Sequence, residues 1–315
     1  MWQIILRRIA WSIPVVFIVS LVVFSLIHLA PGDPATAMVG GDDVDPETVE
    51  RAREQLGLND PLHEQYWRLI SGLFVGDLGT SIMGSEDVAN SILFRLPISV
   101  TLAAGGLFVA LLIALPTGIL AAVKEGGKVD RLVTFFATLG ISTPPFFVGL
   151  LLVLAFAVHL GWLPATGYVR PTEDLMGWMR AMILPSISLG LAPAAEIARH
   201  LRGAMRDVLR QDYVRTAVAK GHRQFVVVGK HALKNAAVPV ITVIGLQLGS
   251  LISGSVVIES VFAIPGMGAL LIRSVVLQDF PMIQGIMVVV VLLILIVNLL
   301  VDISYGALNP KVRST

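Results

Sequence analysis

The residues best suited to binding chemistry gather in one stretch of this sequence, RTAVAKGHRQFVVVGKHALKN, at positions 215–235. Arginine, lysine and imidazole side chains can bind carboxylates and phosphates. Gly221 interrupts the stretch, and a long apolar run follows it. The cluster therefore indicates an anion-binding surface or a docking surface, and the elements on either side of it must position these residues.

Motifs for catalysis or metal binding are absent from the sequence. Gly127-Lys128 and Gly229-Lys230 both lack the upstream Gly and the following Ser or Thr of a phosphate-binding loop. The six histidines are scattered and form no H-E-x-x-H motif, and there is no cysteine. We predict a non-catalytic chain without a catalytic residue, metal or cofactor of its own, so that any ATP chemistry belongs to a partner.

The composition is that of an integral membrane protein. Only 14% of the 315 residues are charged, against about 25% in soluble domains, and the mean hydropathy is +0.81. The net charge of +1 indicates no nucleic-acid partner. A helix that crosses the hydrocarbon core needs about 20 apolar residues. Six stretches qualify, at 10–30, 97–123, 132–160, 181–199, 236–262 and 282–305.

These stretches predict an all-α membrane protein with six transmembrane helices. Lipid offers no partner for free backbone groups, and the apolar runs do not alternate as the strands of a barrel would. Residues 1–30 are interpreted as a retained anchor helix, because the stretch lacks a small-residue cleavage site and exceeds the usual h-region of a signal peptide.

The distribution of Lys and Arg predicts the orientation. With the N-terminus in the cytoplasm, the inside segments hold 16 of the 23 basic residues, among them nine between Arg199 and Lys234. Both termini, including the tail at 306–315, are then cytoplasmic. Residues 31–96 form an outer loop or cap with 12 acidic and four basic residues. Within it, DPETVERAREQLGL predicts a short helix with Asp45 as N-cap, Pro46 in the first turn and Gly57 near its end.

The inner segment at 199–235 has two amphipathic patterns. Four arginines at helical spacing predict that the fourth span continues out of the membrane with one wet or headgroup-contacting face; they are Arg199, Arg202, Arg206 and Arg210. Two apolar stripes separated by Gly221 predict two short helices. Either this hairpin binds anionic lipid, or it inserts into a groove of a cytoplasmic partner.

Motifs along nearly the whole chain resemble those of one family. DYVRTAVAKG, followed after nine residues by HALKNAAVPVITVIGLQLG, is similar to the cytoplasmic loop of ABC importer permeases of the dipeptide, oligopeptide and nickel branch. HLAPGDPA, GDLGTSI, STPPFFVGLLL, GWLPATGY, LPSISLGL, PGMGALLIRSV, DFPMIQG and LNPKVR add to the resemblance. Arg215-Thr216-Ala217 replaces the general Glu-Ala-Ala signature while Gly221 is retained, and His222 stands where an aliphatic residue is usual.

The resemblance implies one half of a permease pair in a bacterial inner membrane. Residues 97–305 would be the transporter domain, with a second related permease, two cytoplasmic ATPases that bind ATP and Mg, and an extracytoplasmic binding protein as partners. The implied substrates are di- or oligopeptides, with nickel or glutathione as alternatives. The loop would be a coupling helix seated in a cleft of an ATPase, and its implied contact residues are Asp212, Arg215, Thr216, Ala217, Lys220, Gly221, His222, Arg223 and Phe225.

Small polar residues in the spans are candidates for lining the pathway, although such residues also pack helices together. They are Ser142, Thr143, Ser186, Ser188, Gln247, Ser250 and Ser253. The competing hypothesis of an ion-driven secondary transporter expects internal repeats and an ionisable pair near the middle of the membrane, and the sequence shows neither. An intramembrane enzyme would need a catalytic set inside the spans, which is also missing.

Overall fold

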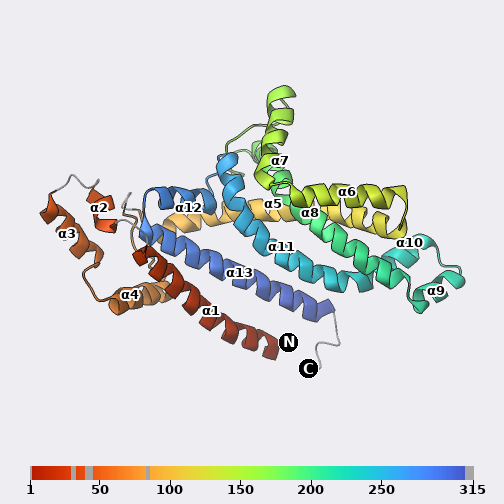
Figure 1. Cartoon of the computed structure of the whole chain (residues 1–315), viewed down its shortest axis with the longest axis horizontal. Coiled ribbons are helices and arrows are strands. Elements are labelled where there is room, and N and C mark those ends of the chain that lie inside the picture. The colour runs from red at the N-terminus through yellow and green to blue at the C-terminus, as the bar shows by residue number, and fades with distance from the viewer. Residues whose placement is uncertain (1, 30–32, 40–44, 83–85, 309–315) are drawn as a thin grey trace. The chain divides into compact units, whose positions relative to one another are not determined.

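A computed structural model describes residues 2–29, 33–39, 45–82 and 86–308. This part of the chain is helical throughout apart from its connections, in which Thr80 and Asp87 form an isolated antiparallel bridge (Figure 1). The predicted tail at 306–315 lies outside the described residues from position 309 onward. The N-terminal half contains α1 (Trp2–Leu29), α2 (Pro34–Val39), α3 (Pro46–Leu56), α4 (Leu62–Val75), α5 (Val88–Val123), α6 (Lys128–Ser142) and α7 (Pro145–Leu152), which continues as the π-helical η1 (Val153–His159).

The C-terminal half starts with the long α8. Its elements are α8 (Leu175–Leu209), α9 (Asp212–Ala219), α10 (Gln224–Val226), the π-helical η2 (Val227–Ala232), α11 (Leu233–Val261), α12 (Met267–Val276) and α13 (Phe280–Leu308). Two compact units divide the chain. The first consists of Met1–Ile5, Val100–Ile264 and Ile296–Thr315, and the second consists of Leu6–Ser99 and Pro265–Leu295.

Four helices among the described residues are long and apolar enough to cross a membrane. They are Val88–Val123, Leu175–Leu209, Gln224–Val261 and Phe280–Val301. The pair α6 and α7–η1 adds a fifth if the two are counted together. Helix α1 covers the first predicted span, and its described apolar part, Ala10–Ser25, is shorter than a full crossing. Several membrane-spanning helices are therefore present, and the count of six stays a prediction.

The span predicted at 132–160 is broken into two helices. Helices α6 and α7 meet at an angle of 103°, and Figure 1 shows α7 leaving the direction of α6. Thr143 between them is extended, with φ −94° and ψ 125°. Pro144 and Pro145 lack backbone donors, and a proline disfavours the helical conformation of the residue before it. The apolar sequence continues across residues 143–145, whereas α6 ends at Ser142 and a new helix begins at Pro145.

The first unit is built on close packing of α5, α6, α8 and α11. Small residues let the backbones approach: a Cβ added to Gly190 of α8 would lie 2.4 Å from the carbonyl oxygen of Gly106 in α5. Around them, a buried apolar core joins α5, α8, η2 and α11, and its members include Ala110, Ile197, Leu201 and Val240. This core runs toward the end of α8 that leads into α9.

The second unit contains the segment predicted as an outer cap. Helix α3 has the predicted start and end, with Pro46 in its first turn and Gly57 in the left-handed conformation behind it. Tyr66 of α4 packs on α1, where its hydroxyl lies 2.9 Å from Ser20 Oγ. Helix α12 was not predicted as a separate helix, and Met267, Leu270, Met282 and Ile286 pack with α5 to form the core of this unit.

Candidate functional site

The cluster at 215–235 lies between the C-terminal end of α8 and the N-terminal end of α11. Figure 1 shows α9 and α10 at these ends of the two long helices. Helix α8 continues to Leu209, as the arginine spacing predicted, and α9 begins at Asp212. Gly221 turns the chain with φ +80°. The second predicted short helix is instead the first part of a long helix, because α10, η2 and α11 run on as one from Gln224 to Val261.

A small apolar core holds α9 in place. Val214 and Ala217 of α9 and Val227 of η2 are buried together, with Val208 and Leu209 of α8 packed against them. A polar contact supports the same arrangement, because Asn235 Nδ2 donates to Tyr213 Oη at 2.7 Å. The loop is therefore a folded knob with internal packing of its own.

The structure separates the predicted coupling residues into one internal and eight surface positions. Ala217 is 8% exposed and faces into the knob. The exposed positions are Asp212, Arg215, Thr216, Lys220, Gly221, His222, Arg223 and Phe225. Val218, which the list of contacts omitted, is 59% exposed, and Phe225 is 88% exposed. Val218 and Phe225 are thus the most exposed large apolar side chains of the knob, and they lie on either side of the Gly221 turn.

The histidines of the knob are close to each other. The rings of His222 and His231 lie 5.9 Å apart between centroids. Among the described residues, no group of three or more His, Asp or Glu side chains is arranged to hold a metal ion. The pair is therefore part of the basic surface in this structure.

Acidic residues in the turn between α5 and α6 and in the first turn of α6 pair with three of the four arginines of α8. Arg202 donates through Nε and Nη2 to the two carboxylate oxygens of Asp130, with an Nη2–Oδ2 distance of 2.8 Å. Arg210 Nη2 donates to Glu125 Oε1 at 2.8 Å, and Arg206 Nη1 lies 3.7 Å from the same oxygen. The prediction of a wet or headgroup-contacting face is therefore wrong for Arg202, which is 27% exposed, whereas Arg206 and Arg210 keep 39% and 64% of their side-chain surface exposed.

The fourth arginine behaves differently. Arg199 donates to Glu196 Oε1 at 2.6 Å within its own helix, and its side chain is 60% exposed. Sequence reasoning identified the arginines and missed their partners. The two carboxylates in the short stretch KEGGKVDR, at positions 124–131, were the available signal.

The candidate pathway residues do not form one group. Ser186 and Ser188 of α8 are buried, and Ser188 Oγ donates to the carbonyl oxygen of Pro145 at 2.6 Å, so both serve helix packing. Thr143 Oγ1 donates to the carbonyl oxygen of Leu139 at 2.7 Å, beside the exposed Ser142. On α11, one side presents three polar residues that remain at least partly exposed: Gln247, Ser250 and Ser253. That side of α11 is the better candidate for the pathway.

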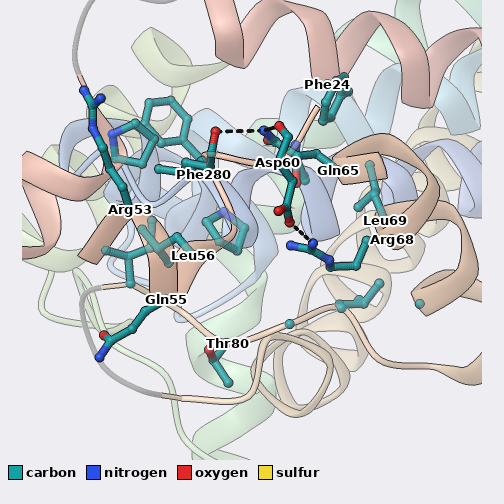
Figure 2. A pocket seen from close by; sticks show the side chains of 18 of the residues that line it. Phe24, Arg53, Gln55, Leu56, Asp60, Gln65, Arg68, Leu69, Thr80 and Phe280 are labelled. Atoms are coloured by element: carbon teal, nitrogen blue, oxygen red, sulfur yellow. Dashed lines mark hydrogen bonds and ion pairs between the residues drawn. The ribbon is translucent and has the colours of Figure 1, made fainter. Parts of the chain in front are cut away.

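The second unit contains a cavity of about 610 Å³. Two ion pairs lie in its wall. Arg53 Nη2 lies 3.0 Å from Asp33 Oδ2, and Arg68 pairs with Asp60, as Figure 2 shows. Gln65 Nε2 donates to the backbone oxygen of Asp60 at 2.8 Å. Phe24, Leu69 and Phe280 add apolar surface. The cavity therefore combines paired charges with an apolar lining, and its size is within the range of ligand sites.

Sequence comparison identifies the class of protein. Residues 114–314 match the family described as the binding-protein-dependent transport system inner membrane component, and residues 1–103 match the N-terminal region described for the same transport systems. The chain belongs to this family of ABC importer permeases, which are non-catalytic, multi-pass membrane subunits.

Individual relatives are similar over nearly their full length. The chain is 43% identical to a glutathione transport system permease protein, GsiC, of Escherichia coli O6:H1, covering 98% of both chains. It is 41% identical to a putative peptide transport system permease protein of Brucella abortus (strain 2308), covering 99% of both. An inward-facing structure of the MetNI methionine ABC transporter superposes with a TM-score of 0.57 at 18% identity, covering 70% of this chain and 96% of that one. This last likeness supports the fold alone.

Proposed function

We propose that this chain is one of two permease subunits that together enclose a pathway for short peptides, with glutathione, itself a tripeptide, in the same substrate class. An extracytoplasmic binding protein delivers the substrate, and two ATPases on the cytoplasmic side bind ATP and Mg and drive transport. The names of the relatives at 43% and 41% identity support the substrate class, because one refers to glutathione and the other to peptides.

The observation that carries the coupling role is the shape of the knob. Val218 and Phe225 are the most exposed large apolar side chains of a segment in which Val214, Ala217 and Val227 form an internal core. A large aromatic side chain held at the surface of a rigid element is typical of an anchor that fills a pocket in a partner. Flanking cations such as Arg215 and Arg223 then surround the anchor with a charged rim.

The orientation follows from the same surface. Nine basic residues lie between Arg199 and Lys234, so the knob belongs on the cytoplasmic side of the membrane, together with both termini. The second unit, with residues 33–39 and 45–82, then contributes the outer cap. Its cavity and paired charges provide the surface on which the binding protein docks.

Co-reconstitution tests the function. The chain is placed in liposomes with its partner permease, the two ATPases and the binding protein, and uptake of a labelled dipeptide, a labelled pentapeptide and labelled glutathione is measured with and without ATP. We expect ATP-dependent uptake of at least one of these peptides. ATP-dependent uptake of nickel alone would overturn the substrate class, and uptake driven by an ion gradient without ATPases would establish a secondary transporter instead.

The absence of cysteine provides a clean test of the orientation. Single cysteines at Glu173, before α8, and at Asp212, the first residue of α9, occupy exposed sites. A membrane-impermeant maleimide added to intact cells should label Glu173→Cys, and it should label Asp212→Cys only after the membrane is opened. The reverse pattern would invert the orientation.

A further inference from the structure

The end of α8 is fastened to the turn between α5 and α6 by a row of ion pairs. Arg202, Arg206 and Arg210 follow one another at intervals of four residues and therefore lie on one face of the helix. Their partners are Asp130, in the first turn of α6, and Glu125, in the turn itself. We call these five residues the arginine ladder.

The Asp130–Arg202 pair is the most buried contact of the arginine ladder. The side chain of Asp130 is only 5% exposed and that of Arg202 is 27% exposed. Two parallel hydrogen bonds join guanidinium and carboxylate, and the backbone N–H of Gly126 donates to Asp130 Oδ2 at 2.9 Å. Bidentate pairing fixes direction as well as distance, so this contact resists both sliding and rotation of α8 against α6.

The second contact of the arginine ladder is closer to solvent. Arg210 is 64% exposed and Glu125 is 37% exposed, and exposed pairs contribute little to stability. Arg210 is nevertheless the C-cap of α8, two residues before α9 begins. Glu125 therefore contacts the segment through which the knob is joined to α8.

The arginine ladder connects two mechanically distinct parts of the first unit. On one side, α8 leads directly into α9 and the knob. On the other side, α6 leads to the 103° bend at Thr143 and Pro144 and then to α7. A displacement of α9 that moves the end of α8 either carries the start of α6 with it or breaks the two hydrogen bonds between Arg202 and Asp130.

We propose that Asp130 and Arg202, supported by Glu125 and Arg210, are positioning residues that transmit movement of α9 to the bent α6–α7 segment. The inference rests on the proposed coupling role of the knob. It differs from that role because it assigns the transmission to a contact within the permease, away from the surface that an ATPase would touch. It also replaces lipid headgroups by internal carboxylates as the partners of these arginines.

The variants Asp130→Asn and Arg202→Gln each remove one charge of the buried pair. Arg199→Gln is the matched control, since it removes the same charge from the same helix and Arg199 pairs with Glu196 of α8 itself. Each variant is reconstituted with all partner subunits, and substrate uptake is divided by ATP hydrolysed. Assembly with the ATPases is measured in parallel, so that loss of folding is separated from loss of transmission.

We expect both ladder variants to bind the ATPases and hydrolyse ATP, with uptake per ATP at least about fivefold lower, the low end of typical coupling between sites. Arg199→Gln should match the unmodified complex. Equal losses in Arg199→Gln and Arg202→Gln would establish a lipid-headgroup role and overturn the proposal. Unchanged uptake per ATP in both ladder variants would overturn it as well.

A chemical replacement of the pair keeps the test decisive if a ladder variant fails to assemble. The chain has no cysteine, so Asp130→Cys combined with Arg202→Cys can be joined by a short bifunctional methanethiosulfonate, with cysteine-free partner subunits. Cross-linking should restore uptake per ATP, and reduction should abolish it again. Failure of the cross-link to restore coupling would overturn the proposal. The unmodified complex reports separately on the proposed function, which fails if that complex itself shows no ATP-driven uptake.

Discussion

Asp279 binds Ser81 across 198 positions of sequence, and the contact is buried. Ser81 Oγ donates to Asp279 Oδ2, while the backbone N–H of Ile82 donates to Oδ1 at 3.3 Å. The same oxygen accepts from the N–H of Met282 at 3.4 Å, in the first turn of α13. One carboxylate thus joins the segment before α5, which contains the motif GDLGTSI, to the start of α13, which contains DFPMIQG.

Removing this carboxylate should destabilise the second unit. In Asp279→Ala, the Ser81 hydroxyl and the Ile82 N–H lose their acceptor inside the protein, which typically costs about 1–3 kcal/mol. Asp77→Ala is the control, because Asp77 is exposed and accepts from Gly79 N at 2.9 Å where water can replace it. Chemical unfolding in detergent measures both free energies. Equal stability of the two variants would contradict the structural role of Asp279.

The crossing of α5 and α8 predicts a second effect on stability. In Gly190→Ala the new Cβ would meet the backbone oxygen of Gly106 at 2.4 Å, and backbone cannot move aside as a flexible side chain could. Overpacking of this kind costs about 1–3 kcal/mol. Gly203→Ala lies in the same helix with no atom within 4 Å of the added Cβ, and it should gain about 0.5–1 kcal/mol of helix stability. We expect the midpoint of thermal unfolding to fall in Gly190→Ala and to rise in Gly203→Ala, each relative to the unmodified chain.

Hydropathy and motif spacing predicted the helices well and their contacts poorly. The apolar stretches predicted the positions of the long helices. Backbone N–H and C=O groups need hydrogen-bond partners in lipid, and a helix provides them within the segment itself. The apolar stretches did not predict that α8 begins at Leu175, ahead of Arg180, or that the helix containing α11 begins at Gln224, in a basic segment. Hydropathy also passed through the bend at Thr143, which depends on backbone geometry.

The candidate site shows the same limit. Ala217 and Val218 are adjacent and both apolar, yet one is internal and the other is at the surface, because the helix places neighbouring side chains about 100° apart. The spacing of Arg202, Arg206 and Arg210 was visible, whereas the partner of Arg202 lies 72 positions away in sequence. Which face of an amphipathic helix meets protein and which meets lipid or solvent depends on tertiary contacts that spacing does not contain.

The turn at Gly221 predicts a graded effect on coupling. Its φ of +80° is costly for residues with a Cβ, by about 1–2 kcal/mol, and Asn tolerates the left-handed region better than β-branched residues. No atom lies within 4 Å of an added Cβ, so the effect arises from backbone conformation without a clash. The amount of ATPase that co-purifies should be highest for Gly221→Asn, lower for Gly221→Ala and lowest for Gly221→Val. Gly229→Ala, which also has open space and no positive φ, should be neutral; a series without this order would argue against a conformational role.

The last prediction concerns Phe225, whose replacement should affect ATPase binding much more than the stability of the permease. The side chain is 88% exposed, so Phe225→Ala should change the stability of the isolated permease by no more than about 0.5 kcal/mol. If Phe225 anchors the knob in an ATPase, the same change should cost about 2 kcal/mol of binding, which corresponds to roughly 30-fold weaker association. Titration of the ATPase against the reconstituted permease measures this affinity.

Phe74 of α4 provides the matched control for Phe225, since it is 87% exposed and lies in the segment proposed for the opposite side of the membrane. Phe74→Ala should leave ATPase affinity unchanged. Ala217→Glu provides the contrast, because it places a charge in the internal core formed with Val214 and Val227 and should unfold the knob itself. Equal ATPase affinities for Phe225→Ala and Phe74→Ala would show that the exposed ring is not the anchor, and the coupling surface would then have to be sought among the charged residues around it.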